Sequence, residues 1–226
     1  YILIDYLQEY ASRLAKTGYL TGDSTLFEEC VSQFLIYEKL LRNPETGLWC
    51  QGRGWCEDST KFSQGAWSRG HGWLMRGIVT SMLYLPEEYR MTLLPLLQRL
   101  SVSLVKAQSP GGMFHILLDF PLAQSVPDVS GTGMIAYYLA ISVKEGWLAE
   151  DNFRPAILKA TRSMKNYVTE QGEVLNSSKG PGPLCSPEEY INYQPEIDEK
   201  HGFQGMVYGM MGEMVLERIG IREDEL

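Results

Sequence analysis

A heptapeptide at residues 67–73, WSRGHGW, gathers side chains that can bind a flat and charged molecule. It holds two of the chain's five Trp, Trp67 and Trp73, with Arg69 and His71 between them. Indole faces stack on rings, and a guanidinium pairs with a carboxylate through two parallel hydrogen bonds. The stretch is therefore either a packing cluster or one wall of a pocket for a charged ring compound.

Other polar side chains stand where loops enter predicted helices. Asp5 and His201 lie at two such junctions, and His115 lies in a short piece that leads to a third. A His or Trp near a helix start is more often a packed core residue, and Asp5 taken alone is more often a helix N-cap. The collection of these residues at one end of a repeated unit favours a pocket.

Several other chemistries lack their sequence motifs. The chain has no HExxH, no GxSxG and no GxxxxGK[ST], and its three His lie far apart in sequence. We therefore expect no metal and no organic cofactor. The formal net charge of −8 argues against nucleic acid or an anionic membrane as the partner, but not against a small anion in a locally basic pocket.

The four Cys predict reduced thiols. Cys30 falls within an apolar helical stripe, and no two Cys form a CxxC pair, so only a Cys50–Cys56 bridge stays open beside free thiols at Cys30 and Cys185. No apolar run approaches the roughly 18–20 residues of a membrane span. With no signal segment visible, we expect a cytoplasmic protein whose true N-terminus lies before Tyr1, because the chain opens without Met and inside a helical pattern.

Helical periodicity dominates the chain and recurs at about sixty residues. Outer amphipathic helices are expected at 26–41, 86–106 and 152–168, the first with a capping box of Thr25 and Glu28. Inner helices rich in small residues are expected to begin near residues 5, 66, 130 and 201. Such repeated hairpins form an all-α array, either an open solenoid or, as we favour from the long period, a closed toroid.

Together with WSRGHGW, the segments TGLWCQ at 46–51, DVSGTGMIAYYLA at 128–140 and HGFQGM at 201–206 are shared with a known group. The chain resembles the unsaturated glycuronyl hydrolases of glycoside hydrolase family 105 and its relative family 88. The resemblance implies an (α/α)6 barrel of six helical hairpins. Because about four inner helices are found, it also implies that residues 1–226 form the C-terminal portion of a single barrel domain lacking about two N-terminal hairpins.

The resemblance implies a hydrolase for the 4,5-unsaturated uronic acid at the non-reducing end of lyase-generated oligosaccharides. A carboxylic acid protonates C4 and then, as a carboxylate, activates the water that adds at C5. The hemiketal collapses and releases the neighbouring sugar and a keto acid. Most glycosidases need two carboxyl groups, whereas here one Asp with a pKa raised by burial can carry out both transfers.

The resemblance assigns roles to individual residues. Asp5, in the run DYLQE where the family usually has a DDLFM-like run, takes the place of the general acid/base. The family's WxRxxxW pattern falls on Trp67, Arg69 and Trp73, which are expected to contact the sugar. Further candidates for substrate contact are Gln51, which replaces a family His, and His71, His115 and His201.

Two rival interpretations stay open. A non-catalytic relative could keep the Trp and Arg pocket and bind carbohydrate without proton transfer. An all-helical scaffold could bind a protein partner through an apolar groove. In the favoured interpretation the partner is a small oligosaccharide of pectic, ulvan or glycosaminoglycan origin.

Overall fold

The computed structural model describes residues 1–58, 60–192 and 199–218 of the chain. The helices are α1 (Tyr6–Thr21), α2 (Ser24–Leu41), α3 (Ser68–Tyr84), α4 (Glu87–Ala107), α5 (Val129–Lys144), α6 (Glu150–Met164), η1 (Lys165–Tyr167), α7 (Pro187–Asn192) and α8 (Glu199–Arg218). Two short strands, β1 (Ile2–Leu3) and β2 (Gly52–Arg53), pair antiparallel. The all-α fold class is confirmed.

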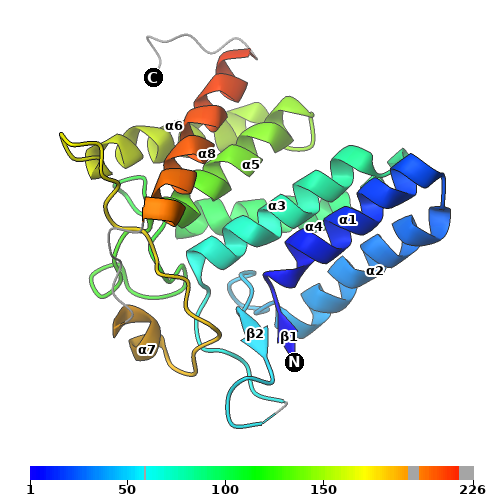
Figure 1. Ribbon diagram of the computed structural model, residues 1–226, viewed down its shortest axis with the longest axis horizontal. Helices are drawn as coiled ribbons and strands as arrows, with labels where there is room; N and C mark the ends of the chain where they lie inside the picture. Colours follow the sequence, from blue (N-terminus) through cyan, green and yellow to red (C-terminus); the bar gives the residue numbers. More distant parts are fainter. Residues whose placement is uncertain (59, 193–198, 219–226) are drawn as a thin grey trace.

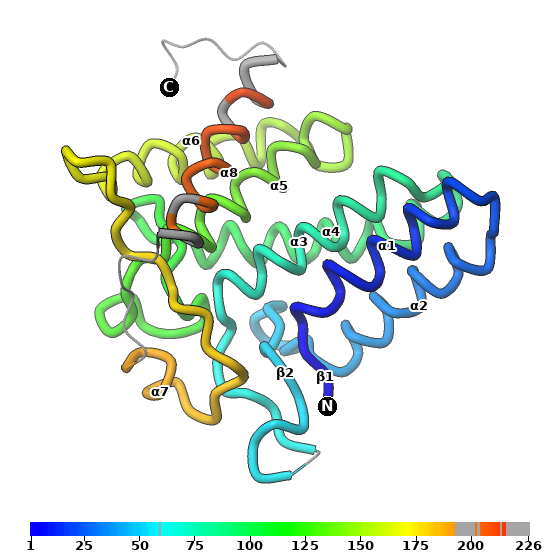
Figure 2. Tube along the Cα trace, viewed as in Figure 1, coloured from blue at the N-terminus to red at the C-terminus, as the bar shows by residue number. Residues whose placement is uncertain are grey.

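The helices alternate between an inner and an outer row. The inner helices α1, α3, α5 and α8 are neighbours in that order, and α2, α4 and α6 pack outside them (Figure 1). The chain runs from α1 to α2, from α3 to α4 and from α5 to α6, each time from an inner to an outer helix, as the trace in Figure 2 shows. These are the helical hairpins expected from the repeat, in the order in which the sequence places them.

The turn between α1 and α2 shows how local chemistry sets the helix ends. Gly22 ends α1 with a φ of 74°, a left-handed conformation that strains residues with a side chain. Asp23 then caps α2, because its Oδ1 accepts a hydrogen bond of 3.0 Å from the amide of Thr25. The predicted capping box is therefore wrong, since Thr25 lies inside α2 and the residue at the N-cap of α2 is Asp23.

Small residues let the inner helices approach closely. A Cβ added to Gly72 of α3 would lie 2.7 Å from the Cβ of Met134 on α5, and one added to Gly133 of α5 would collide with the backbone of Gly205 on α8. Real Cβ atoms do not approach so closely, so a larger residue would push the helices apart. The close approach keeps the starts of the inner helices near one another.

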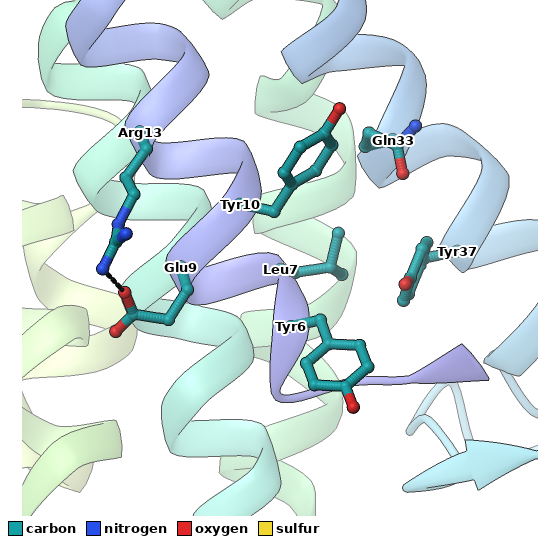
Figure 3. A pocket seen from close by; sticks show the side chains of 7 residues that line it. All are labelled: Tyr6, Leu7, Glu9, Tyr10, Arg13, Gln33 and Tyr37. Atoms are coloured by element: carbon teal, nitrogen blue, oxygen red, sulfur yellow. Dashed lines mark hydrogen bonds and ion pairs between the residues drawn. The ribbon is translucent and has the colours of Figure 1, made fainter. Parts of the chain in front are cut away.

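One face of α1 is exposed and aromatic. Tyr6 and Tyr10 are 53% and 51% exposed, and with Tyr37 of α2 they line a hollow of about 480 Å³ (Figure 3). Glu9 and Arg13 form an ion pair on α1 beside it. Asp5 is not among the residues that line this hollow.

Two properties of the whole described part bear on function. No helix in residues 1–58, 60–192 and 199–218 is long and apolar enough to cross a membrane. Within the same ranges, His, Cys, Asp and Glu do not gather in threes where they could hold a metal ion.

Candidate active site

The starts of α1, α3 and α5 meet at the end of the array where the long loops gather (Figure 1). Next to α1, the amide of Ile4 donates to the carbonyl of Gln51 (2.8 Å), and a Cβ on Gly70 of α3 would lie 3.3 Å from the side chain of Ile4. Between α3 and α5, the hydroxyl of Ser68 donates to Asp128 Oδ2 (2.7 Å). The structure thus brings these three helix starts together.

Asp5 occupies the N-cap position of α1, but its side chain makes no capping hydrogen bond. Its Oδ2 is buried and has no hydrogen-bond partner among the described residues. Burial raises the pKa of Asp5 from 3.8 to about 6, against the opposing effects of a backbone hydrogen bond and the Arg69 guanidinium. A carboxyl group in this range can both give and accept a proton near neutral pH. Asp5 therefore lacks the hydrogen bond of a helix N-cap, and its role as general acid/base stays a prediction.

Arg69 and Trp67 form one buried unit at the start of α3. The guanidinium of Arg69 lies 5.0 Å from the centre of the Trp67 ring, a cation–π contact. Arg69 Nη1 donates to Ser130 Oγ (3.2 Å) and to the carbonyl of Ser178, and Trp67 Nε1 donates to Ser178 Oγ (2.9 Å). The Arg69 guanidinium also acts to lower the pKa of Asp5, so the unit of Arg69 and Trp67 lies within electrostatic reach of that carboxyl.

Gln51 is fixed beside this site by partners at both ends of its amide. Its Nε2 donates to the carbonyl of Pro181 (2.9 Å), and its Oε1 accepts a hydrogen bond of 2.5 Å from the hydroxyl of Tyr190. Burial raises the pKa of Tyr190 to about 12, and the Asp5 carboxylate contributes in the same direction. Gln51 therefore connects the segment before α1 to the loop at residues 176–186, which we call the covering loop.

His71 has a packing environment in the structure and no exposed surface. Its Nε2 accepts a hydrogen bond from the amide of Trp49 (2.9 Å), which leaves Nδ1 to donate to the carbonyl of Trp67 (2.8 Å). Burial lowers the pKa of His71 to about 4, so the ring is neutral at pH 7. We assign His71 to holding the Gly-turn segment against the start of α3 and no longer to substrate contact.

Replacing His71 by Gln should destabilise the fold by about 2 kcal/mol at pH 7, because a buried pair of hydrogen bonds is disturbed. The pKa of His71 falls from 6.5 to about 4 on folding, so the stability that the neutral ring provides is present above pH 6.5 and is lost as the pH falls towards 4. The difference in unfolding free energy between the wild type and His71→Gln should therefore become smaller at lower pH. Urea unfolding of both proteins at pH 7 and pH 4.5 measures it, and an advantage independent of pH would contradict this assignment.

The other predicted sugar contacts are placed differently. Trp73 is half-buried on α3. The guanidinium of Arg76 lies over its ring, 5.6 Å from the ring centre. His115 Nδ1 lies 2.8 Å from the carbonyl of Ser125, and the residue lines a separate hollow of about 340 Å³ against η1. His201 falls in α8, but its side chain lies outside the described part of the structure.

Cys56 and Cys185 form a disulfide between the loop after β2 and the loop before α7. The prediction of reduced thiols is wrong for this pair, and so is the Cys50–Cys56 alternative, because Cys50 and Cys30 are the free thiols. Spacing rules missed the bond because its partners lie 129 residues apart in sequence. Disulfides persist in oxidising compartments, so this one does not favour the expected cytoplasmic location.

The double variant Cys56→Ser/Cys185→Ser should lose up to about 4 kcal/mol of unfolding free energy, because the bond restrains a long loop in the unfolded chain. Guanidinium unfolding would measure this, with Cys50→Ser as the matched control at a half-buried free thiol. Thiol titration of the unfolded, unreduced wild type should detect two thiols, Cys30 and Cys50. Detection of all four would show that the bond is absent.

Four residues of the site were missed from the sequence: Asp128, Ser130, Ser178 and Tyr190. Asp128 and Ser130 did carry a signal, since an Asp two positions before a Ser at a helix start is typical of an N-cap. Ser178 and Tyr190 carried none. They come from the long segment after residue 175, which only tertiary contacts bring to the site.

The chain is similar in sequence to several known proteins. The sequence model of Glycosyl Hydrolase Family 88 matches residues 4–215. An unsaturated 3S-rhamnoglycuronyl hydrolase of Alteromonas sp. (strain LOR) is 25% identical over 171 residues, which are 73% of this chain and 41% of that protein. A hydrolase of the same name from Formosa agariphila is 27% identical over 110 residues, 48% of this chain and 29% of that protein.

The fold is also found among solved structures. A possible member of the GH105 family from Salmonella enterica subsp. enterica serovar Paratyphi A has a TM-score of 0.82 and 28% sequence identity. The match covers 96% of this chain and 57% of that one. The chain thus spans little more than half of this structure and less than half of the two curated relatives.

Proposed function

Because the chain belongs to glycosyl hydrolase family 88, we propose that it acts in the hydrolysis of unsaturated uronic acids at the non-reducing end of oligosaccharides. The activity is proposed for the whole protein, of which residues 1–226 would form one portion of a single (α/α) barrel domain. The names of the two curated relatives favour a glycuronyl–rhamnose linkage as the first substrate to test.

The observation that carries this proposal is the buried carboxyl of Asp5. Its Oδ2 has no hydrogen-bond partner among the described residues, and its pKa of about 6 keeps a useful fraction protonated near neutral pH. In the proposed reaction Asp5 delivers its proton to C4 of the double bond. The carboxylate left behind then takes a proton from the water that adds at C5, which restores the starting state.

Arg69 has an electrostatic role in this scheme. Only 2% of Arg69 is exposed, and Gly180 of the covering loop lies against its Nη2. This burial favours an action through charge, on Asp5 and on the negative uronic acid, over a direct ion pair with the sugar. In a chain of net charge −8, a cation at this position also offsets the repulsion of an anionic substrate.

We assign different roles to the two tryptophans of the heptapeptide. Trp67 is only 3% exposed, too little to stack on a sugar, so it supports the site from within. Trp73 is half-buried and follows Arg69 by four residues, which places both on the same face of α3. We therefore assign sugar stacking to Trp73.

Incubation of the whole protein with lyase-generated oligosaccharides tests the proposal, because hydration removes the conjugated double bond and its ultraviolet absorbance. We expect the absorbance to fall and a keto acid to appear. Binding measured by calorimetry without loss of absorbance would favour the non-catalytic relative. If no oligosaccharide binds, the carbohydrate site itself is refuted and the protein-binding scaffold is favoured.

A further inference from the structure

We propose that Asp128 is a positioning residue that holds Arg69 and Trp67 in place beside Asp5. This inference rests on the proposed function for its consequence in catalysis, but its structural part can be tested without substrate. Asp128 is fully buried at the N-cap of α5.

The carboxylate of Asp128 accepts hydrogen bonds from three separate segments. Its Oδ1 accepts from the amide of Ser130 (3.0 Å), the hydroxyl of Ser130 (2.6 Å) and the amide of Ser178 (3.1 Å), while Oδ2 accepts from the hydroxyl of Ser68 (2.7 Å). These residues belong to the starts of α5 and α3 and to the loop at 176–180. A buried carboxylate is strongly destabilising unless such donors surround it, so the segments are held together around it.

The same serines carry the contacts of the proposed active site. Ser130 gives its only hydroxyl proton to Asp128, which leaves its oxygen as an acceptor for Arg69 Nη1. Ser178, held through its amide, accepts from Arg69 through its carbonyl and from Trp67 Nε1 through its hydroxyl. Asp128 thus fixes both the position of the two acceptors and the direction of the Ser130 hydroxyl.

A comparison with Asp23 distinguishes the positioning role of Asp128 from ordinary helix capping. Asp23 at the N-cap of α2 binds Thr25 in the same local pattern, with 3.0 Å to the amide and 2.6 Å to the hydroxyl. Asp23 is exposed, and its described hydrogen bonds stay within this turn. The pair Asp23 and Asp128 therefore shares the cap and differs in the bonds to Ser68 and Ser178.

The test compares Asp128→Ser with the matched control Asp23→Ser. Serine keeps a capping oxygen in both helices but is too short to reach the other segments. Asp128→Ser should lower kcat about 10²-fold, the size of effect expected when a catalytic group is misplaced by about 1 Å. It should also move the decline of activity above about pH 6 to higher pH, since Arg69 would no longer lower the pKa of Asp5. Asp23→Ser should leave kcat and the pH profile unchanged.

Nuclear magnetic resonance gives a readout that needs no activity. The indole N–H of Trp67, assigned with Trp67→Phe, should lose protection from hydrogen exchange in Asp128→Ser and keep it in Asp23→Ser. If the wild type proves inactive while this difference is seen, the positioning role stands and the proposed function fails. Unchanged protection in Asp128→Ser, or a lower kcat without the change in pH profile, would overturn the positioning role.

Asp128→Asn covers the case in which the shorter variant does not fold. The amide oxygen can keep the three bonds to Oδ1, and the amide nitrogen can donate to Ser68. It should therefore retain indole protection and a kcat within about tenfold of the wild type. Loss of indole protection in this isosteric variant, with the helices intact by circular dichroism, would refute the proposed geometry.

Discussion

Replacing Asp5 by Asn is expected to lower kcat on unsaturated oligosaccharides by about 10³-fold, because the amide can neither protonate C4 nor accept a proton from water. The binding of substrate should change little, since the carboxyl acts on the reacting atoms and not on the rest of the sugar. Absorbance assays at saturating substrate measure kcat directly. Asp151→Asn on the exposed start of α6 is the matched control and should keep full activity.

The same substitution should stabilise the protein at alkaline pH. The folded-state pKa of Asp5 lies at about 6, above its ordinary value of 3.8, so burial is tolerated while the group is protonated and becomes costly as the pH rises through 6. This raised pKa corresponds to a loss of about 3 kcal/mol of unfolding free energy in the wild type at pH 8. The loss disappears below pH 3.8, where Asp5 is protonated in both the folded and the unfolded state. Urea unfolding of Asp5→Asn and wild type at pH 8 and pH 4 would measure this gain.

Two outcomes would contradict the role given to Asp5. Full activity of Asp5→Asn would show that another group transfers the proton. Equal stability of the variant and the wild type at pH 8 would show that Asp5 is solvated and has an ordinary pKa. Lost activity together with gained stability is the combination expected of a strained catalytic carboxyl.

Replacing Arg69 by Gln is expected to lower kcat/KM by about 10²-fold. The variant removes the cation beside Asp5, so the pKa of Asp5 should rise further and the decline of activity with pH should move to higher pH. It also removes the planar group that bonds Ser130 and Ser178 while it covers Trp67. The pH profile of kcat/KM from pH 5 to pH 9 is the measurement.

Two further variants serve as controls for Arg69→Gln. Arg69→Lys keeps the charge but not the planar geometry, so it should restore the pH profile more fully than the rate. Arg99→Gln removes an exposed arginine that pairs with Glu38 on the outer row, and it should change neither. A normal pH profile in Arg69→Gln would show that Arg69 does not act on Asp5.

The order and type of the helices could be read from the sequence because they depend on local physics. Apolar residues at helical spacing predicted the outer helices, and clusters of small residues predicted where the inner ones begin. The error at the start of α2 moved the cap by only two residues, from Thr25 to Asp23, whereas α7 starts within a segment predicted as loop. The resemblance over the whole chain then pointed to Asp5 and to the Trp and Arg motif.

The tertiary structure decided what each polar residue of the motif does. Residues 67, 69, 71 and 73 are spaced two positions apart in sequence, and each step of two residues turns a helix by about 200°. His71 is therefore turned towards Trp49, whereas Arg69 is turned towards Ser130 and Ser178. No spacing rule distinguishes these environments before the neighbouring helices are in place.

The covering loop, the disulfide and the Asp128 network also come from tertiary structure alone. They join segments 50 to 139 residues apart, and the sequence holds no local signal for pairs so distant. The helices form because each turn stabilises the next, whereas the site forms because packed helices bring their ends to one place. The sequence by itself therefore determined the helical hairpins and pointed to Asp5 as a candidate acid. Only the packing of the helices decided which side chains surround Asp5.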